Sequence, residues 1–314
     1  MISKFSSASG FYPWQTTINM KISLTGIGLH KGDNIDITLK PTKANSGIRF
    51  IRTDLNCDII ERIVIPNYKN VSDTNMCTTI KNDYDVQIST IEHLMAAFSG
   101  TGLDNVDVEI NGSEVPIMDG SSDQFVNLIE STGLIKLPEK RKFLKITKPV
   151  EIRDGDKKCS LSPCDKMKFF ASIDFSDKVI GKQEASVNLE NFNFKNDVSK
   201  ARTFGFMQDV EALRRSGLGL GGSLENCVII DNNEVINSEG LRFDNEFVVH
   251  KLLDAVGDIF TSGFRIQGEY RGYLCGHHMN NLLLKELFDN EDSFEFIEID
   301  EKNSPEIKNK LLTA

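Results

Sequence analysis

The sequence predicts an α+β protein of two domains, covering residues 1–138 and 139–314. Three observations lead to this prediction. Strand-like segments come in runs with helices between them, their apolar and polar residues alternate, and the stretch 137–142 (LPEKRK) is charged and carries a proline. Alternation of this kind is typical of mostly antiparallel sheets that are covered on one face. We therefore expect helices layered on such sheets, with residues 137–142 as the linker between the domains.

In the first domain, residues 1–14 are expected to form a polar, loosely ordered extension. Ser89 and Glu92 fit a capping box, which would start a helix at Ser89. An Asn111-Gly112 pair predicts the turn that closes a strand. The expected elements are, in order, strands within 16–50, a helix from 89 to 100, a strand at 105–110 and a helix from 122 to 130, which stops at Gly133.

The second domain begins again with strand patterns and ends in helical ones. Its expected elements are strands at 143–152 and 167–175 and helices at 207–215, 245–262 and 280–288. No sequence repeat relates the two domains, so any symmetry between them has to be structural.

Composition restricts the class of protein. Hydrophobic residues make up 39% and charged residues 26% of the 314, as in globular proteins, and the formal net charge of −10 argues against a nucleic-acid partner. The first 15 residues contain no continuous apolar region and no apolar run reaches the length of a membrane span. Six scattered cysteines suit free thiols in a reducing compartment, so we expect a cytoplasmic location.

Two short segments carry the predicted chemistry. His250 and Asp254 are four residues apart, which places both on one face of a helix, where they can grip a divalent metal or form a solvated ion pair. His93 supplies a third ligand in the same hypothesis. Glu92 is either the base beside that ligand or the acidic member of the capping box with Ser89. Taken together, these residues match a hydrolytic zinc site with an open position for water.

Further candidates follow downstream. His277 and His278 are each a candidate zinc ligand, general acid or simple helix-start residue. Asp258 could keep an imidazole protonated, because a neighbouring carboxylate raises the pKa of histidine. Thr203 is a candidate hydroxyl donor to an oxyanion, or an ordinary strand or turn residue.

Seven short motifs follow one another along the chain. They are 25–32 (TGIGLHKG), 89–94 (STIEHL), 102–105 (GLDN), 114–121 (EVPIMDGS), 199–206 (SKARTFGF), 250–258 (HKLLDAVGD) and 276–281 (GHHMNN). In this order they resemble the UDP-3-O-acyl-N-acetylglucosamine deacetylases of lipid A synthesis. The resemblance extends from about Gln15 to Leu284, and the motifs are very specific as a set.

The resemblance implies two similar domains, each a layer of helices on a sheet, with the active site between them. It implies an acyl-chain passage formed by an insert at about 213–235. It also implies roles for individual residues. The implied zinc ligands are His93, His250 and Asp254, the implied general base is Glu92, and the implied general acid is His277, oriented by Asp258. Thr203 would stabilise the oxyanion. The implied substrate contacts are Lys251, Phe204, Lys157 (phosphate) and Phe175 (uracil).

The sequence departs from the family pattern at His278, Leu274 and Ser176. The expected reaction is zinc-dependent removal of acetate from a UDP-activated, acylated amino sugar. A zinc amidase or peptidase of other specificity and a non-catalytic sugar-nucleotide binding protein are the alternatives. Iron is a second candidate for a site of two histidines and an aspartate. We expect a monomer and leave open a transient association with the membrane surface.

Overall fold

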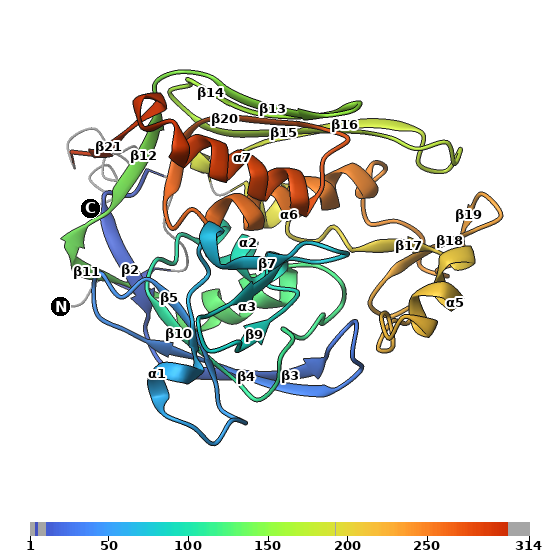
Figure 1. The fold of residues 1–314 in the computed structure, drawn as a ribbon, viewed down its shortest axis with the longest axis horizontal. Helices are drawn as coiled ribbons and strands as arrows, with labels where there is room; N and C mark the ends of the chain where they lie inside the picture. Colours follow the sequence, from blue (N-terminus) through green and yellow to red (C-terminus); the bar gives the residue numbers. More distant parts are fainter. Residues whose placement is uncertain (1–3, 6–10, 192, 301–314) are drawn as a thin grey trace.

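The computed structural model describes residues 4–5, 11–191 and 193–300. In the first half of the chain, a five-stranded sheet carries two helices on one face, α2 (Glu92–Thr101) and α3 (Asp123–Thr132) (Figure 1). The strands of this sheet are, in spatial order, β3 (Ile22–Ile27), β4 (Asn34–Pro41), β10 (Val106–Ile110), β5 (Ile48–Arg52) and β6 (Ile63–Val64). A short helix α1 (Ile59–Arg62) precedes β6, and the small sheet of β7 (Val71–Asp73), β8 (Thr79–Lys81) and β9 (Gln87–Ile88) precedes α2.

The second half has a larger sheet that carries α6 (Glu246–Phe260) and α7 (His277–Asp289). Its strands are β12 (Lys142–Ile146), β13 (Val150–Asp154), β14 (Lys157–Ser162), β15 (Met167–Asp174), β16 (Lys182–Asn188), β20 (Arg265–Tyr273) and β21 (Phe294–Glu298). Between β16 and α6 lie α4 (Phe194–Asp197), β17 (Phe204–Phe206), α5 (Met207–Arg215), β18 (Val228–Asp231) and β19 (Glu234–Val235). Among the helices of the described ranges, none is long and apolar enough to cross a membrane.

The two halves repeat one strand-pairing pattern. In the first, β4 pairs antiparallel with β3 and β10, β10 runs parallel to β5, and β5 pairs antiparallel with β6. In the second, β14 pairs antiparallel with β13 and β20, β20 runs parallel to β15, and β15 pairs antiparallel with β16. This is the structural symmetry between α+β domains that the sequence alone does not display.

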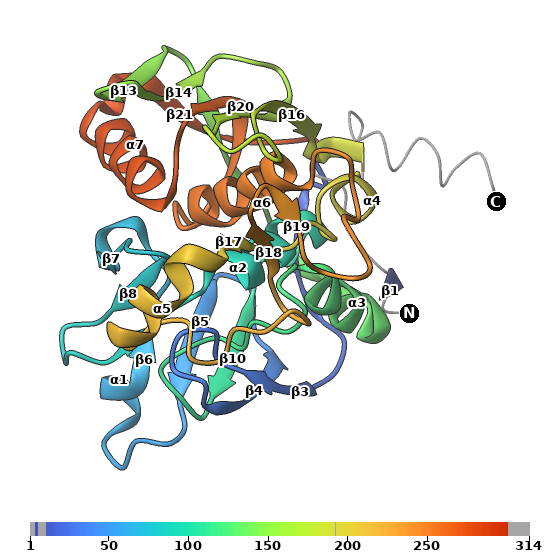
Figure 2. The same ribbon diagram turned by 90° about the vertical axis from the view of Figure 1, so that its right-hand side faces the viewer.

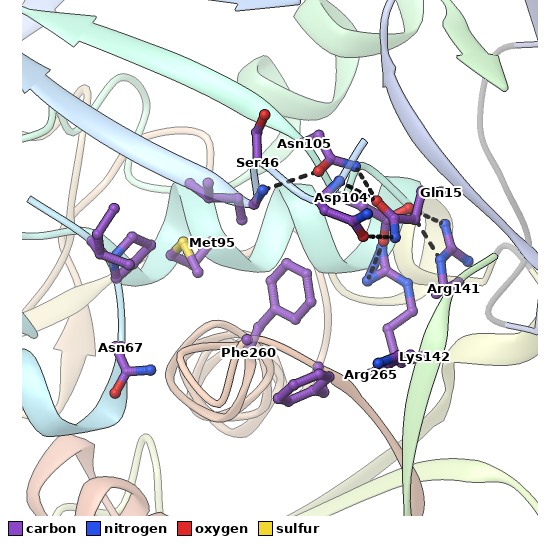
Figure 3. A pocket seen from close by; sticks show the side chains of 17 residues that line it. Gln15, Ser46, Asn67, Met95, Asp104, Asn105, Arg141, Lys142, Phe260 and Arg265 are labelled. Carbon is purple, nitrogen blue, oxygen red and sulfur yellow. Dashed lines mark hydrogen bonds and ion pairs between the residues drawn. The ribbon is translucent and has the colours of Figure 1, made fainter. Parts of the chain in front are cut away.

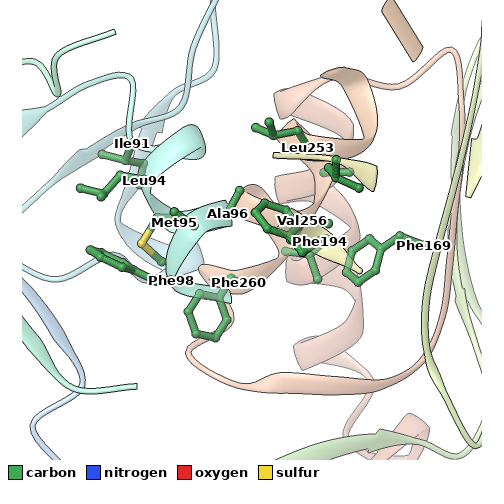
Figure 4. Packing of buried hydrophobic residues seen from close by; sticks show 14 of the residues in the cluster. Ile91, Leu94, Met95, Ala96, Phe98, Phe169, Phe194, Leu253, Val256 and Phe260 are labelled. Atoms are coloured by element: carbon green, nitrogen blue, oxygen red, sulfur yellow. The ribbon is translucent and has the colours of Figure 1, made fainter. Parts of the chain in front are cut away.

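The molecule is built in four layers, with a sheet on each outer side and the helices of both halves meeting in the middle (Figures 1 and 2). On α2, Leu94 and Phe98 face the first sheet, whereas Ala96 faces Val256 of α6 (Figure 4). All four side chains are buried. The two apolar layers therefore join into one core, and α2 lies directly against α6.

The structure corrects several expected boundaries. Helix α2 begins at Glu92 rather than Ser89, because Thr90 has a φ of 58° and this left-handed conformation interrupts the helix. The capping box with Ser89 is therefore wrong. Helix α7 begins at His277, three residues earlier than expected, and the strand expected at 143–152 is divided into β12 and β13.

The stretch 137–142 is not a flexible linker. Most of it belongs to β11 (Leu134–Lys140), which pairs with β2 (Trp14–Ile18) and with β1 (Lys4–Phe5). Arg141 then leads into β12. Lys4–Phe5 thus form a strand within the expected N-terminal extension, while residues 1–3 and 6–10 lie outside the described part of the chain. The division near residue 138 stays a prediction.

Candidate active site

Helices α2 and α6 bring His93, His250 and Asp254 together between the two halves. One ligand atom of each lies within 4.8 Å of the others, and all three side chains are buried. The Asp254 Oδ1 atom lies 3.5 Å from His93 Nε2 and 3.4 Å from His250 Nε2. His250 and Asp254 are neighbours because they stand one helical turn apart, whereas His93 joins them through the packing of α2 on α6.

The polar atoms of this cluster fit a divalent metal. His250 donates a hydrogen bond from Nδ1 to the Ala201 carbonyl at 3.0 Å, which leaves Nε2 as a free lone pair facing Asp254. Oδ1 of Asp254 is buried and has no hydrogen-bond partner among the described residues. A buried carboxylate oxygen without a donor is costly unless a cation compensates it. Two imidazoles and a carboxylate are also a ligand set found in catalytic zinc sites.

The pKa values agree with ligand chemistry. Burial lowers the pKa of His250 to about 3, so its imidazole is neutral at pH 7 and can bind a metal. Burial alone would raise the pKa of Asp254, but His250 and Lys251 outweigh it and hold the pKa well below its usual value. Lys251 contributes through an ion pair of 2.7 Å between its Nζ and Asp254 Oδ2.

Glu92 and His277 face each other beside the three candidate ligands. His277 Nε2 lies 4.0 Å from Glu92 Oε1, while Glu92 Oε2 accepts a hydrogen bond from the Thr78 amide at 3.0 Å. Burial raises the pKa of Glu92. For His277, burial would lower the pKa, but the charge of Asp258 outweighs it and raises the pKa to about 9. An acidic and a basic group with shifted pKa values in one buried site are suited to proton transfer.

Asp258 orients the His277 ring through a hydrogen bond with Nδ1. His277 donates from Nδ1 to Asp258 Oδ2 at 2.9 Å, and Asn280 donates to the same oxygen at 2.8 Å. The other oxygen accepts from the Thr78 hydroxyl at 2.6 Å. Tyr270 in turn donates to Asn280 at 2.6 Å. This buried network fixes the imidazole with Nε2 directed at Glu92.

The residues expected to contact the substrate differ in how near they lie to the candidate metal ligands. The centre of the Phe204 ring lies 6.3 Å from that of His250 and 6.0 Å from that of Phe175. Phe204 therefore connects Phe175 to the candidate metal ligands. Phe175 also lines a surface cavity of about 610 Å³. Thr203 stands between Ala201, the acceptor of His250, and Phe204. Phe204 therefore lies beside a candidate metal ligand, and Phe175 contacts Phe204 in turn.

Lys157 stands apart, at the exposed start of β14. Its charge reaches the Cys275 thiol, whose pKa is lowered by a hydrogen bond with Cys159, by backbone hydrogen bonds and to a lesser extent by Lys157. Cys275 is two residues from His277, so Lys157 lies near the segment that leads into α7.

The structure separates the two adjacent histidines at the start of α7. His277 is buried, whereas His278 is exposed and its Nδ1 lies 3.4 Å from the Thr74 hydroxyl. Successive helical residues diverge by about 100°. For this reason His278 points away from the candidate ligands, and His277 alone faces them.

Sequence reasoning gave His30 no role. The side chain is buried, neither ring nitrogen has a hydrogen-bond partner among the described residues, and burial lowers its pKa. His30 lines an apolar cavity of about 310 Å³ together with Thr203, Phe204 and residues of the insert, including Leu213 and Cys227. Its place in the 25–32 motif is the signal that could have identified it.

Fold and site together define a class: a protein of two α+β halves with a buried cluster of residues that could hold a metal, and a glutamate and a histidine facing each other beside it. Residues 15–289 match the family described as UDP-3-O-acyl N-acetylglycosamine deacetylase. The chain belongs to this family, as the sequence motifs predicted.

Curated relatives extend the same result over almost the whole chain. A UDP-3-O-acyl-N-acetylglucosamine deacetylase of Idiomarina loihiensis is 43% identical over 293 residues, which are 92% of this chain and 94% of the relative. A protein of the same name from Colwellia psychrerythraea is 42% identical over 93% of this chain and 95% of its own. A third, from Campylobacter jejuni, is 43% identical over 91% and 95%.

Proposed function

We propose that this chain is the deacetylase that hydrolyses the 2-acetamido group of UDP-3-O-acyl-N-acetylglucosamine and releases acetate, a step of lipid A biosynthesis. The family and the names of the relatives support this substrate and reaction. The observation in the structure that supports it most strongly is the Glu92–His277 pair, 4.0 Å apart beside three buried residues that fit a metal.

We assign His93, His250 and Asp254 as the residues that hold the metal, with zinc as the preferred ion. A bound zinc ion supplies Lewis acidity, which polarises the acetyl carbonyl and lowers the pKa of water near the site. Lys251 neutralises the second oxygen of Asp254, since its Nζ lies 2.7 Å from Oδ2, and it is also a candidate contact for the sugar.

Glu92 is the proposed general base. It accepts a proton from the water that attacks the acetyl carbonyl carbon, and burial makes it a stronger base than an exposed carboxylate because its pKa is raised. Thr203 is the proposed hydroxyl donor to the oxyanion that forms on the carbonyl oxygen.

His277 is the proposed general acid. It is cationic at pH 7 because Asp258 outweighs the effect of burial and raises its pKa to about 9. It donates its proton to the amide nitrogen as the C–N bond breaks, so that glucosamine leaves as an amine and acetate remains. Asp258 does not react but keeps the imidazole oriented and charged.

The remaining substrate groups have proposed places around this centre. The apolar cavity of about 310 Å³ beside Phe204 is suited to the acyl chain. Phe175 is the proposed stacking partner of uracil, and Lys157 the proposed partner of a phosphate. We also propose that the enzyme acts as a cytoplasmic monomer whose acyl substrate brings it transiently to the membrane surface.

A deacetylation assay on UDP-3-O-acyl-N-acetylglucosamine, with and without a chelator, tests the proposal. We expect acetate release that a chelator abolishes and that added zinc restores. Peptides and simple N-acetyl sugars serve as control substrates and are expected to be poor. Release of acetate that survives stoichiometric metal removal would contradict the metal assignment, and equal turnover of the control substrates would contradict the substrate.

A further inference from the structure

A third cavity, of about 300 Å³, is lined by residues of both halves of the molecule (Figure 3). Met95 of α2 and Phe260 of α6 are in its wall, whereas the candidate metal ligands lie nearer the start of each helix. Asp104, Arg141 and Arg265 gather at one end of the cavity, and Asn67 lies at the opposite end (Figure 3).

The charge of this cavity is opposite to that of the protein. Its charged lining residues are three cations, Arg141, Lys142 and Arg265, and one acid, Asp104. The whole chain, in contrast, has 46 acidic and 36 basic residues. A local positive excess within an acidic chain, in a concave site, favours an anionic occupant.

Arg141 pairs with one oxygen of the Asp104 carboxylate. Its Nε and Nη2 donate to Asp104 Oδ2 at 3.1 and 2.7 Å, and its Nη1 donates to the Tyr12 carbonyl at 3.0 Å. The same carboxylate oxygen also accepts from the Thr16 amide at 2.9 Å. These hydrogen bonds to Asp104 fall on Oδ2, and the other oxygen, Oδ1, lies toward a second arginine.

Arg265 is that second arginine, so two guanidinium groups share the single carboxylate of Asp104. Its side chain is 3% exposed, and its nearest carboxylate oxygen, Asp104 Oδ1, lies 3.6 Å from Nη1. Nη2 donates to the Phe98 carbonyl at 3.3 Å, but Nε and Nη1 have no hydrogen-bond partner among the described residues. Burial, and then repulsion by Arg141, lowers its pKa to about 9, so the guanidinium is still cationic at pH 7.

We infer that this cavity is a binding site for a small oxyanion, a carboxylate or a phosphate on a compact molecule, with Arg265 as its principal contact. Three lining cations against one carboxylate leave the cavity with a positive excess, which water would not balance. An oxyanion would balance it, because it carries the opposite charge and accepts hydrogen bonds from guanidinium and ammonium groups. Lys142, exposed at the rim, adds a second positive charge.

The rest of the lining sets the size and kind of molecule. A volume of about 300 Å³ is at the lower end of ligand pockets, which run from roughly 300 to 1,000 Å³. Polar side chains from the first half, Gln15, Asn45 and Asn67, could bind hydroxyl or carbonyl groups, while Ile48 and Phe264 offer apolar walls. Because both halves contribute, an occupant would also bridge them and stabilise their contact.

Calorimetric titration of the intact, metal-loaded protein with inorganic phosphate, and separately with acetate, tests the inference at ionic strength matched with sodium chloride. Two variants remove the site in different ways. Arg265→Met deletes the charge, and Ser46→Phe fills the cavity from its rim while leaving Arg265 in place. Arg271→Met is the matched control, since Arg271 is on the same strand but exposed and paired with Glu269.

We expect saturable binding of at least one of the two anions to the unaltered protein and to Arg271→Met. Loss of a charge-assisted hydrogen bond should weaken binding about tenfold or more in Arg265→Met, and Ser46→Phe should abolish it. Comparison of phosphate with acetate then identifies the preferred oxyanion. Absence of binding, or equal affinity in the unaltered protein and a folded Ser46→Phe variant, would overturn the inference. The second result would place any bound anion elsewhere, for example at the metal.

Discussion

Gly257 of α6 lies directly against the backbone of Glu92 in α2. A β-carbon added at Gly257 would be 2.0 Å from the Glu92 carbonyl oxygen and 3.1 Å from the Ala96 amide nitrogen. The absence of a side chain at this position thus allows the two central helices to approach each other. The approach also sets the distance between His93 on one helix and His250 and Asp254 on the other.

Substitution of Gly257 by alanine should therefore force α2 and α6 apart. Overpacking of a buried contact costs about 1–3 kcal/mol, and the neighbouring atoms here are backbone that cannot turn away. We expect a lower free energy of unfolding in denaturant titrations, together with weaker zinc binding. Gly205→Ala is the control for stability, because a β-carbon at Gly205 would meet no atom within 4 Å. Equal stability of the two variants would contradict the proposed role of Gly257.

Replacement of Glu92 by glutamine should separate proton transfer from metal binding. The amide keeps the shape of the side chain and an oxygen for the Thr78 amide, but it cannot accept the proton of the attacking water. General bases contribute about 10²- to 10⁴-fold, so we expect kcat to fall by that range. Zinc content, measured by elemental analysis, should be unchanged. Loss of zinc in parallel with activity would instead assign Glu92 as a ligand.

The pH dependence of kcat/KM should have an acidic limb set by Glu92 and an alkaline limb set by His277. Glu92 must be deprotonated and His277 protonated, and His277 has a pKa of about 9 in the metal-free protein. Asp258→Asn removes the charge that raises this pKa. The alkaline limb should then move to lower pH, since the imidazole loses its proton earlier. A limb that does not move in this variant would show that His277 is not the titrating acid.

Much of the site was predictable from spacing and motif order, and the exceptions have physical causes. His250 and Asp254 share a helical face, which local geometry determines. The start of α2 at Glu92, which excludes the capping box with Ser89, depends on the conformation of Thr90. The φ of 58° at Thr90 cannot be inferred from residue type, because β-branched residues rarely adopt it. The hydroxyl of Thr90 donates to the buried Glu114 at 3.1 Å, so a partner 24 residues away accompanies this turn.

The fold shows the same division between local and distant causes. The helix at 207–215 and the end of α3 at Gly133 were predicted correctly, because apolar spacing and glycine act locally. The segment 137–142, in contrast, has the composition of a linker but forms strand through pairing with β2, more than 100 residues away. The contact of α2 with α6 could likewise not be predicted from the sequence. Gly257, which lies against the backbone of α2, is the one local residue that marks it.

The adjacent residues His277 and His278 offer the sharpest test of the site, because one substitution in each probes a buried and an exposed face of the same helix. His277→Ala removes the proposed acid and the partner of Asp258, so we expect kcat to fall by about 10²- to 10⁴-fold. His278→Ala should leave turnover unchanged and alter the free energy of unfolding by less than about 0.5 kcal/mol. Its side chain is exposed, and among the described residues its hydrogen-bond partner is the Thr74 hydroxyl at 3.4 Å. Steady-state rates and zinc content of both variants decide the matter. A large loss of activity in His278→Ala, with zinc retained, would mean that the second imidazole takes part in proton transfer.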